Sequence, residues 1–164
     1  MDEVSQPVNA ATITRPQPIP NSVTLGFWEA VAAGGLSIQR CADCGVYQHP
    51  PRPYCQACSG SSLRYEAVSG EGQLWSWSRC YHNVLPGLDA AVPFTCFLVE
   101  LNEQPGLLIA GDLIGREDLA CEFRLGMPMR LVPGRTEDAG HLDRGLPTFA
   151  PYPSSQELSL EEEL

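Results

Sequence analysis

The hydrophobic pattern changes near residue 70, and the later part of the chain has the two-residue period of β-strands. Large and small side chains alternate in several short runs, and turn-forming residues separate these runs. The pattern predicts five strands, at residues 74–81, 93–101, 107–114, 126–132 and 146–152, with one helical turn within residues 116–125. Five short strands of this kind favour a small Greek-key barrel of the OB type over a sandwich.

One earlier segment has helical periodicity instead. Apolar residues recur at helical spacing after Asn21, which can cap a helix, and two glycines end the pattern. We therefore predict a short amphipathic helix over residues 22–33. Its aromatic face either packs on the protein's own core or presents Phe27 and Trp28 to a partner, and the pattern leaves both alternatives open.

Two Cys-x-x-Cys motifs, Cys41 with Cys44 and Cys55 with Cys58, stand ten residues apart after this helix. A small residue follows each motif, so the backbone can turn round a metal ion. Four thiolates at this spacing suit tetrahedral Zn²⁺ in a closed structural site and suit iron less well. Disulfides are the alternative, but they need an export signal, and the acidic N-terminal sequence does not resemble one. We predict a four-cysteine zinc site.

Two short strands, at residues 36–40 and 63–68, are predicted to flank these motifs. Between the motifs lie three prolines within residues 46–54, which favour a stiff extended loop. His49 lies in this loop. Four thiolates already complete a zinc site, so we expect His49 to bond to a thiolate or contact a partner rather than act as a fifth ligand.

The other cysteines, Cys80, Cys96 and Cys121, form no further Cys-x-x-Cys motif and are expected to be small buried hydrophobic residues. His82 would share a strand face with Cys80, so a thiol–imidazole pair is conceivable. This pair would lack both a recognisable third residue of a catalytic triad and a site for an oxyanion. The chain also lacks the glycine motifs of phosphate-binding loops and of nucleophile elbows. The sequence indicates no convincing catalytic site.

The charge balance bears on the choice of partner. The chain of 164 residues has 20 acidic and 10 basic side chains, all ten of them arginines, and a net charge of −10. Nucleic acid would be repelled, although Trp75, Trp77 and Tyr81 alternate on one strand face and could stack on bases. No apolar run approaches the roughly 18 residues of a membrane span. Seven cysteines without an export signal indicate a reducing cytoplasm.

These patterns divide the chain into four parts. Residues 1–21 are rich in proline and predicted to be a disordered arm, and residues 154–164 an acidic disordered tail. Residues 22–68 would hold the helix and the zinc ribbon, and residues 69–153 the OB-fold barrel.

This order of elements resembles the domain-of-unknown-function-35 family, in which a rubredoxin-like zinc ribbon precedes an OB-fold and which is associated with acyl-CoA metabolism. The resemblance covers residues 22–153, and its specificity comes from the linked order of the motifs rather than from any one of them. The matching motifs are Phe27-Trp28-Glu29-Ala30, residues 36–45, His49-Pro50-Pro51-Arg52-Pro53, Cys55-Gln-Ala-Cys58, residues 69–76 and Gly126-Met127-Pro128-Met129.

The resemblance implies an accessory subunit rather than a self-sufficient enzyme. Family members bind thiolase-like proteins in acyltransferases, HMG-CoA synthase assemblies and retro-aldolases of steroid side-chain breakdown, and some bridge to a hydratase. By analogy we expect a heterotetramer whose thiolase-like subunit binds the CoA thioester, with the steroid retro-aldolase as the preferred reaction. A single-stranded nucleic-acid-binding OB protein is the alternative that the charge balance disfavours.

A partner would be contacted by apolar and proline-rich surface near the ribbon. The residues expected there are Phe27, Trp28, Tyr47, His49, Pro50 and Arg52. Arg52 and Arg79 could also approach a CoA phosphate, although pairing with nearby acidic side chains is the commoner role of a surface arginine.

Overall fold

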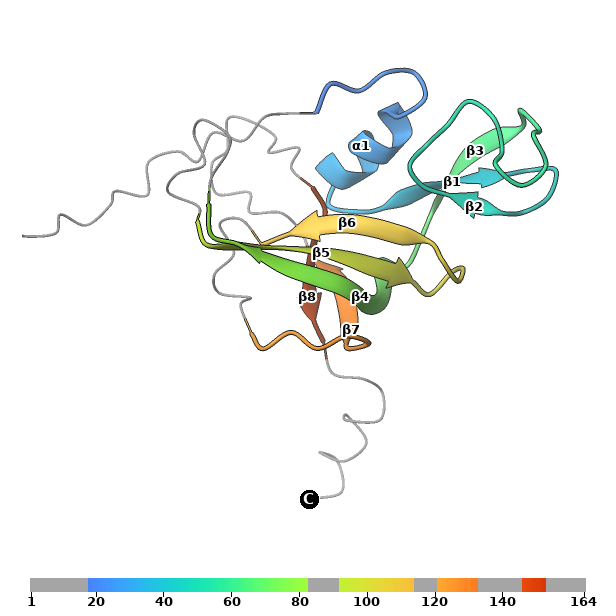
Figure 1. The fold of residues 1–164 in the computed structure, drawn as a ribbon. Helices are drawn as coiled ribbons and strands as arrows, with labels where there is room; N and C mark the ends of the chain where they lie inside the picture. Colours follow the sequence, from blue (N-terminus) through green and yellow to red (C-terminus); the bar gives the residue numbers. More distant parts are fainter. Residues whose placement is uncertain (1–17, 83–91, 114–120, 133–145, 153–164) are drawn as a thin grey trace, which may run out of the picture.

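The fold is mainly β, as predicted, and its described residues form one helix ahead of two small sheets (Figure 1). A computed structural model describes residues 18–82, 92–113, 121–132 and 146–152. Most of the predicted N-terminal arm, the acidic tail and the predicted helical turn up to residue 120 lie outside these ranges. The elements are α1 (Leu25–Ala32), β1 (Ser37–Cys41), β2 (Tyr47–Gln48), β3 (Leu63–Ala67), β4 (Glu71–Cys80), β5 (Phe94–Leu101), β6 (Leu108–Asp112), β7 (Pro128–Val132) and β8 (Thr148–Pro151).

Helix α1 is shorter than the predicted 22–33 because a turn precedes it. The side-chain oxygen of Asn21 accepts hydrogen bonds from the N–H groups of Val23 (2.9 Å) and Thr24 (3.0 Å), which closes a turn before the first helical residue. At the other end, Gly34 takes a φ of 78° and stops the helix, as predicted. No helix in the described part of the chain is long and apolar enough to span a membrane.

The first sheet is the ribbon, with the strand order β2-β1-β3. β1 and β3 pair in antiparallel fashion along their whole length. The prediction of an irregular proline-rich segment missed β2, which forms because Tyr47 and Gln48 come just before the prolines and pair with Arg40 and Gln39. The prolines that follow end this strand after two residues.

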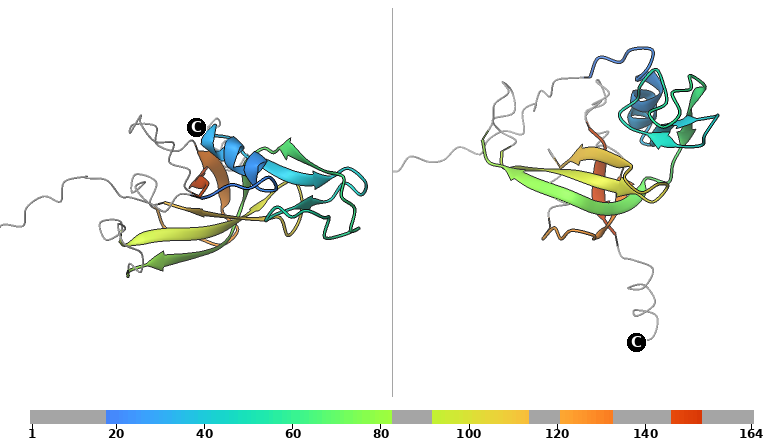
Figure 2. Two further views of the ribbon diagram at one scale, coloured as in Figure 1. Left: turned by 90° about the horizontal axis from the view of Figure 1, so that it is seen from above. Right: turned by 45° about the vertical axis from the view of Figure 1, so that its right-hand side comes forward.

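The second sheet has the order β6-β5-β4-β7-β8 and curls on itself, as the OB-type pattern predicts (Figure 2). Its two ends approach at Gly111, where an added Cβ would collide with the carbonyl oxygen of Pro147 and the ring of Phe97. Inward-facing residues from all five strands fill the interior. Its most deeply buried members are Leu74, Val99, Leu101, Ile109, Met129 and Phe149.

A β-bulge interrupts the alternation of β4. The register shifts between Leu74 and Ser76, which leaves Trp75 as the extra residue. Beyond the bulge, Trp77 pairs with Phe97, whose side chain is buried in the barrel. Trp75 and Trp77 therefore do not share one regular strand face, and the arrangement considered for base stacking is wrong. Neither glycine nor proline marks the bulge, so the sequence pattern does not reveal it.

Side chains of the β5–β6 turn fasten the ribbon to the barrel. The side-chain amide of Gln104 donates to the carbonyl oxygen of Tyr47 (3.0 Å) and accepts from its N–H (2.9 Å), so it takes the place of a neighbouring strand beside β2. Glu103 accepts a hydrogen bond from the N–H of Ser69 (2.7 Å), where the chain passes from ribbon to barrel. These bonds fix the ribbon relative to the barrel.

Helix α1 lies against β3 through Gly26 and Tyr65. A Cβ at Gly26 would lie 2.5 Å from the nearest atom of the Tyr65 ring, and the Tyr65 hydroxyl donates to the carbonyl oxygen of Val23 (2.6 Å). The absence of a side chain at Gly26 therefore allows the ring to pack closely against the helix.

We expect the substitution Gly26→Ala to lower the free energy of unfolding by about 1–3 kcal/mol, because the new methyl group overlaps the Tyr65 ring. Helix propensity alone would change it in the opposite direction by about 1 kcal/mol. Denaturant unfolding followed by tryptophan fluorescence measures the difference. Gly35→Ala is the control, because its new Cβ would lie 3.7 Å from the carbonyl oxygen of Ala30. A Gly26→Ala protein more stable than the parent would contradict this packing.

Candidate metal centre

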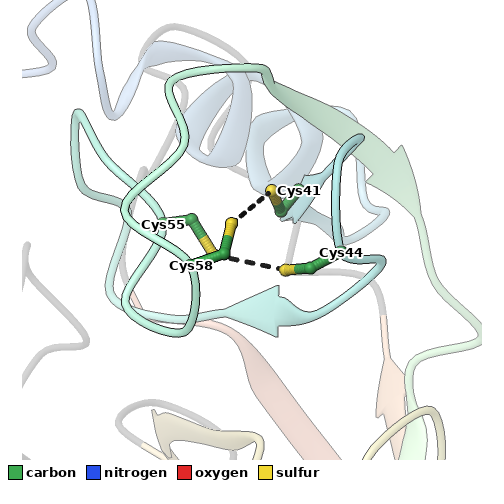
Figure 3. A group of neighbouring side chains, drawn as sticks. All are labelled: Cys41, Cys44, Cys55 and Cys58. Atoms are coloured by element: carbon green, nitrogen blue, oxygen red, sulfur yellow. Dashed lines mark hydrogen bonds between the residues drawn. The ribbon is translucent and has the colours of Figure 1, made fainter.

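The four predicted ligands converge at one end of the ribbon (Figure 3). Their Sγ atoms all lie within 4.8 Å of one another, and the pairs Cys41–Cys58 and Cys44–Cys55 are each separated by 3.6 Å. Tetrahedral zinc with Zn–S bonds of about 2.3 Å places its sulfurs about 3.8 Å apart. A disulfide would need about 2.0 Å. The four cysteines therefore fit a tetrahedral zinc ion and would hold it.

The N–H groups of Cys58 and Ala57 lower the pKa of the Cys55 thiol to about 7, which favours the thiolate that zinc requires.

The first knuckle (residues 41–45) and the second knuckle (residues 55–59) are the two Cys-x-x-Cys turns, and they have the same backbone conformation. The N–H of Gly45 donates to the carbonyl oxygen of Cys41, and the N–H of Ser59 donates to that of Cys55, each at 2.9 Å. The residue after each motif has a left-handed backbone conformation, with a φ of 78° at Gly45 and 62° at Ser59. The predicted turn of small residues round the metal is confirmed, with Ser59 rather than Gly60 in the left-handed position.

Two buried glutamines that sequence analysis did not single out position the second knuckle. Gln48 donates to the side-chain oxygen of Gln39 (2.7 Å) and accepts from the N–H of Gln56 (2.9 Å), next to the metal ligand at position 55. The same oxygen of Gln39 accepts from the N–H of Arg52 (2.9 Å). Both side chains are nearly inaccessible, at 6% and 4% exposure. The amides thus hold the proline loop and the second knuckle against β1 and β2. A glutamine at an inward-facing strand position is the only hint that the sequence contains.

Arg40 holds the first knuckle. Its Nε donates to the carbonyl oxygen of Gly45 (2.8 Å), and its Nη1 donates to the Glu66 carboxylate (2.9 Å). Glu66 also accepts hydrogen bonds from Arg64 (2.7 Å) and from the Tyr47 hydroxyl (3.2 Å). The guanidinium groups of Arg40 and Arg64 lower the pKa of Glu66 to about 2. This carboxylate therefore stays ionised at neutral pH and links all three ribbon strands.

Phe27 belongs to the protein's own core, which is the first of the two alternatives considered for the helix. It is 3% exposed, and its ring lies 4.9 Å from that of Trp28 and 4.8 Å from that of His49 between centroids. Phe27 is thus not available for direct contact with a partner. It supports Trp28, which is half-buried, and anchors the proline loop through His49.

The other expected contact residues differ in exposure. Tyr47 is half-buried, with the Arg40 guanidinium 4.9 Å above its ring. Pro50 and Arg52 are exposed on the proline loop, followed by Tyr54 at 63% exposure. The accessible part of the expected contact surface is therefore the proline loop with the edge of Trp28.

His49 does not bond to a thiolate, so the first of the two roles expected for it is wrong, and the partner contact stays a prediction. Its Nδ1 is buried and has no hydrogen-bond partner, while its ring packs on Phe27. Burial lowers its pKa from 6.5 to about 4. The ring is therefore neutral at physiological pH and acts as a packing group between the helix and the proline loop.

This depressed pKa predicts a loss of stability in mild acid. The unfolded chain takes up a proton at His49 below about pH 6.5, whereas the folded chain resists it until about pH 4. The contribution of neutral His49 is complete above pH 6.5 and declines as the pH falls towards 4. Between pH 7 and pH 5 the unfolding free energy should fall by about 2 kcal/mol more in the parent than in His49→Phe. Denaturant unfolding at both pH values measures this, and equal losses in the two proteins would contradict it.

The remaining cysteines are not the buried hydrophobic residues that we expected. Cys80 and Cys96 are half-buried, and Cys121 is exposed. No hydrogen bond joins Cys80 to His82, which is also exposed and follows the end of β4. The structure thus does not bring together the thiol–imidazole pair that the spacing allowed. His141 lies outside the described residues.

Comparison with known proteins places this architecture in a family. Residues 28–64 match the family described as ChsH2, rubredoxin-like zinc ribbon domain, and residues 65–133 match ChsH2, C-terminal OB-fold domain. The chain belongs to the ChsH2 family. Both ChsH2 modules are matched in the order that the sequence pattern predicts, and the four cysteines lie within the zinc-ribbon match.

Several ChsH2-like proteins are named by function. The chain is 33% identical over 117 residues to a probable enoyl-CoA hydratase alpha subunit of Thermomonospora curvata and 36% identical over 107 residues to the 3-oxo-4,17-pregnadiene-20-carboxyl-CoA hydratase alpha subunit of Mycobacterium tuberculosis. These matches cover 71% and 65% of this chain but only 35% and 32% of the relatives, so the chain spans about a third of their length. A solved structure titled Ltp2-ChsH2(DUF35) aldolase is similar with a TM-score of 0.63 and 29% identity, over 82% of this chain and 98% of the other.

Proposed function

We propose that this chain is a zinc-stabilised accessory subunit of a thiolase-like acyl-CoA enzyme, and that the enzyme is a retro-aldolase of steroid side-chain degradation. The observation that carries the proposal is the likeness to nearly the whole ChsH2(DUF35) chain of a solved aldolase. The name of the mycobacterial relative, a pregnadiene-carboxyl-CoA hydratase alpha subunit, supports a steroid CoA thioester as the substrate class.

The metal chemistry supports a scaffold role. When bound, zinc would supply a rigid cross-link between the two knuckles, and four thiolates leave no open coordination position for a substrate. The residues round the site position the metal ligands. Arg40 holds the first knuckle, and Gln39 and Gln48 hold the second. The CoA thioester would therefore be bound and cleaved mainly by the partner.

The ribbon in turn fixes the surface that we propose for partner contact. Gln104 joins β2 to the barrel, and Phe27 joins α1 to the proline loop through His49. Pro50, Arg52 and the edge of Trp28 are thereby held in one orientation. A preorganised surface loses less conformational entropy on binding than a flexible loop would. We propose that it contacts a thiolase-like dimer in a cytoplasmic heterotetramer, which can also recruit a hydratase.

Purification of the tagged chain from its native host, with metal analysis of the same sample, tests the proposal. We expect a thiolase-like subunit with about one zinc ion per chain, and retro-aldol cleavage of a steroid side-chain CoA thioester by the recovered pair. A pair that transfers acyl groups instead would replace the retro-aldolase by an acyltransferase or an HMG-CoA synthase assembly. Recovery of the chain alone, or with nucleic acid, would refute the accessory role.

A further inference from the structure

The second half of β4 has an open edge. β4 pairs with β7 only at residues 71–73, and beyond the bulge at Trp75 it pairs with β5 alone among the described residues. Figure 1 shows the β4–β5 pair extending past β7 and β8, at the end of the molecule away from the ribbon. A strand edge of this kind presents main-chain groups to which another strand can bond.

The register of the strands identifies which main-chain groups face outward. The carbonyl oxygen of Thr95 accepts from Leu113 next to β6, so the odd-numbered residues of β5 face β6 and the even-numbered ones face β4. The β4 partners of those even-numbered residues, Ser76 and Ser78, therefore direct their own groups towards β5. The N–H and C=O groups of Trp77 and Arg79 consequently point away from the sheet.

The side chains along this edge have the composition of an interface centre. Trp75, Trp77 and Tyr81 are 54%, 41% and 64% exposed. The Arg79 guanidinium lies 6.0 Å from the centre of the Tyr81 ring. Tryptophan, tyrosine and arginine are the residues most enriched among those that contribute most to binding between proteins.

Arg79 has no carboxylate partner among the described residues, whereas most described arginines have one. Four arginines have a carboxylate within 3.5 Å, namely Arg40, Arg64, Arg124 and Arg130. Among the described residues, only Arg52 and Arg79 have none, so the pairing expected for these two is not found within this part of the chain. No acidic residue occurs between Gln73 and His82. The open edge is therefore locally basic in a chain of net charge −10.

These features together indicate what kind of peptide segment binds the open edge of β4. Main-chain groups that bond to no described residue favour an extended segment, exposed tryptophans favour apolar side chains on it, and Arg79 favours a carboxylate. A second copy of this chain would bring another charge of −10 and another unpaired arginine to the same edge. We propose that the β4 edge from Trp75 to Tyr81 binds an extended, acidic segment of the thiolase-like partner as an added strand. This inference rests on the proposed function and adds a second contact surface to the one proposed near the ribbon.

Hydrogen exchange with single-residue readout, on the free chain and on the purified complex with the thiolase-like partner, tests the proposal. In the free chain the amides of Ser76 and Ser78 should be protected by β5, and those of Trp77 and Arg79 should exchange fast. Complex formation should slow exchange at Trp77 and Arg79 by about 100-fold or more, because an added strand accepts their hydrogen bonds. Ser76 and Ser78 are the internal control.

A pair of surface variants tests the charge. Arg79→Gln and Gln73→Glu each lower the net charge by one, but Gln73 pairs with Pro128 of β7 and lies outside the open edge. We expect Arg79→Gln to weaken partner binding by about tenfold, mainly through faster dissociation, and Gln73→Glu to change it little.

Each other outcome would overturn the proposal in a distinguishable way. A complex that forms with unchanged exchange at Trp77 and Arg79 would refute the added strand and leave the accessory role intact. A free chain that is dimeric, with both amides already protected, would assign the edge to a second copy. If no thiolase-like partner is recovered, the accessory role and the added strand both fail.

Discussion

Replacement of Cys41 by serine is expected to remove zinc, unfold the ribbon and abolish partner binding together. Cys41 is 1% exposed and ends β1, so its thiolate ties the central ribbon strand to both knuckles. The ribbon has few buried apolar residues of its own, chiefly Leu36 and Ile38. The roughly 10–16 kcal/mol that structural zinc contributes in comparable small modules cannot be replaced by such a core.

Zinc content, amide exchange in β1 and β3, and co-purification of the proposed thiolase-like partner measure these three effects. Cys58→Ser should give the same result, because its thiolate lies on the other knuckle. Cys121→Ser is the control, since that thiol is exposed and outside the cluster. A Cys41→Ser protein that has lost its metal and still binds the partner would show that the ribbon is not the scaffold of the interface.

Gln48→Leu should lower the free energy of unfolding by about 2–4 kcal/mol, although leucine is apolar and the site is 4% exposed. The substitution removes the donor to Gln39 and the acceptor of the Gln56 N–H, and it leaves that N–H without its hydrogen bond. The second knuckle would then lose both of these hydrogen bonds and depend more strongly on its zinc ligands. We expect zinc transfer to a chromogenic chelator to become about tenfold faster, as for other groups that orient metal ligands.

Two control variants separate an effect on the position of the second knuckle from an effect on core packing in general. Gln73→Leu makes the same chemical change on the exposed face of β4 and should alter stability by less than about 0.5 kcal/mol. Phe149→Leu would lower stability through the barrel core, where Phe149 is fully buried, without changing the rate of zinc release. Unchanged zinc release in Gln48→Leu would limit the glutamine network to a role in folding.

Local chemistry explains what could be predicted. Two Cys-x-x-Cys motifs define a metal site because each turn brings its own pair of sulfurs together, whatever surrounds it. The strands of the barrel followed from the alternation of large and small residues, since one side of each strand is buried. The bounds of α1 were less accurate, because the side chain of Asn21 closes a turn before the helix begins.

The order of the elements and the four thiolates can thus be predicted from the amino-acid sequence, because they depend on neighbours within a few positions. Only the folded chain shows that Phe27 faces His49, that Gln104 replaces a strand beside Tyr47, and that the bulge in β4 turns Trp77 towards the barrel. Each of these depends on contacts between segments far apart in the chain. A side chain's local pattern does not specify which distant group it will meet, so the open edge of β4 becomes visible only when the sheet is assembled.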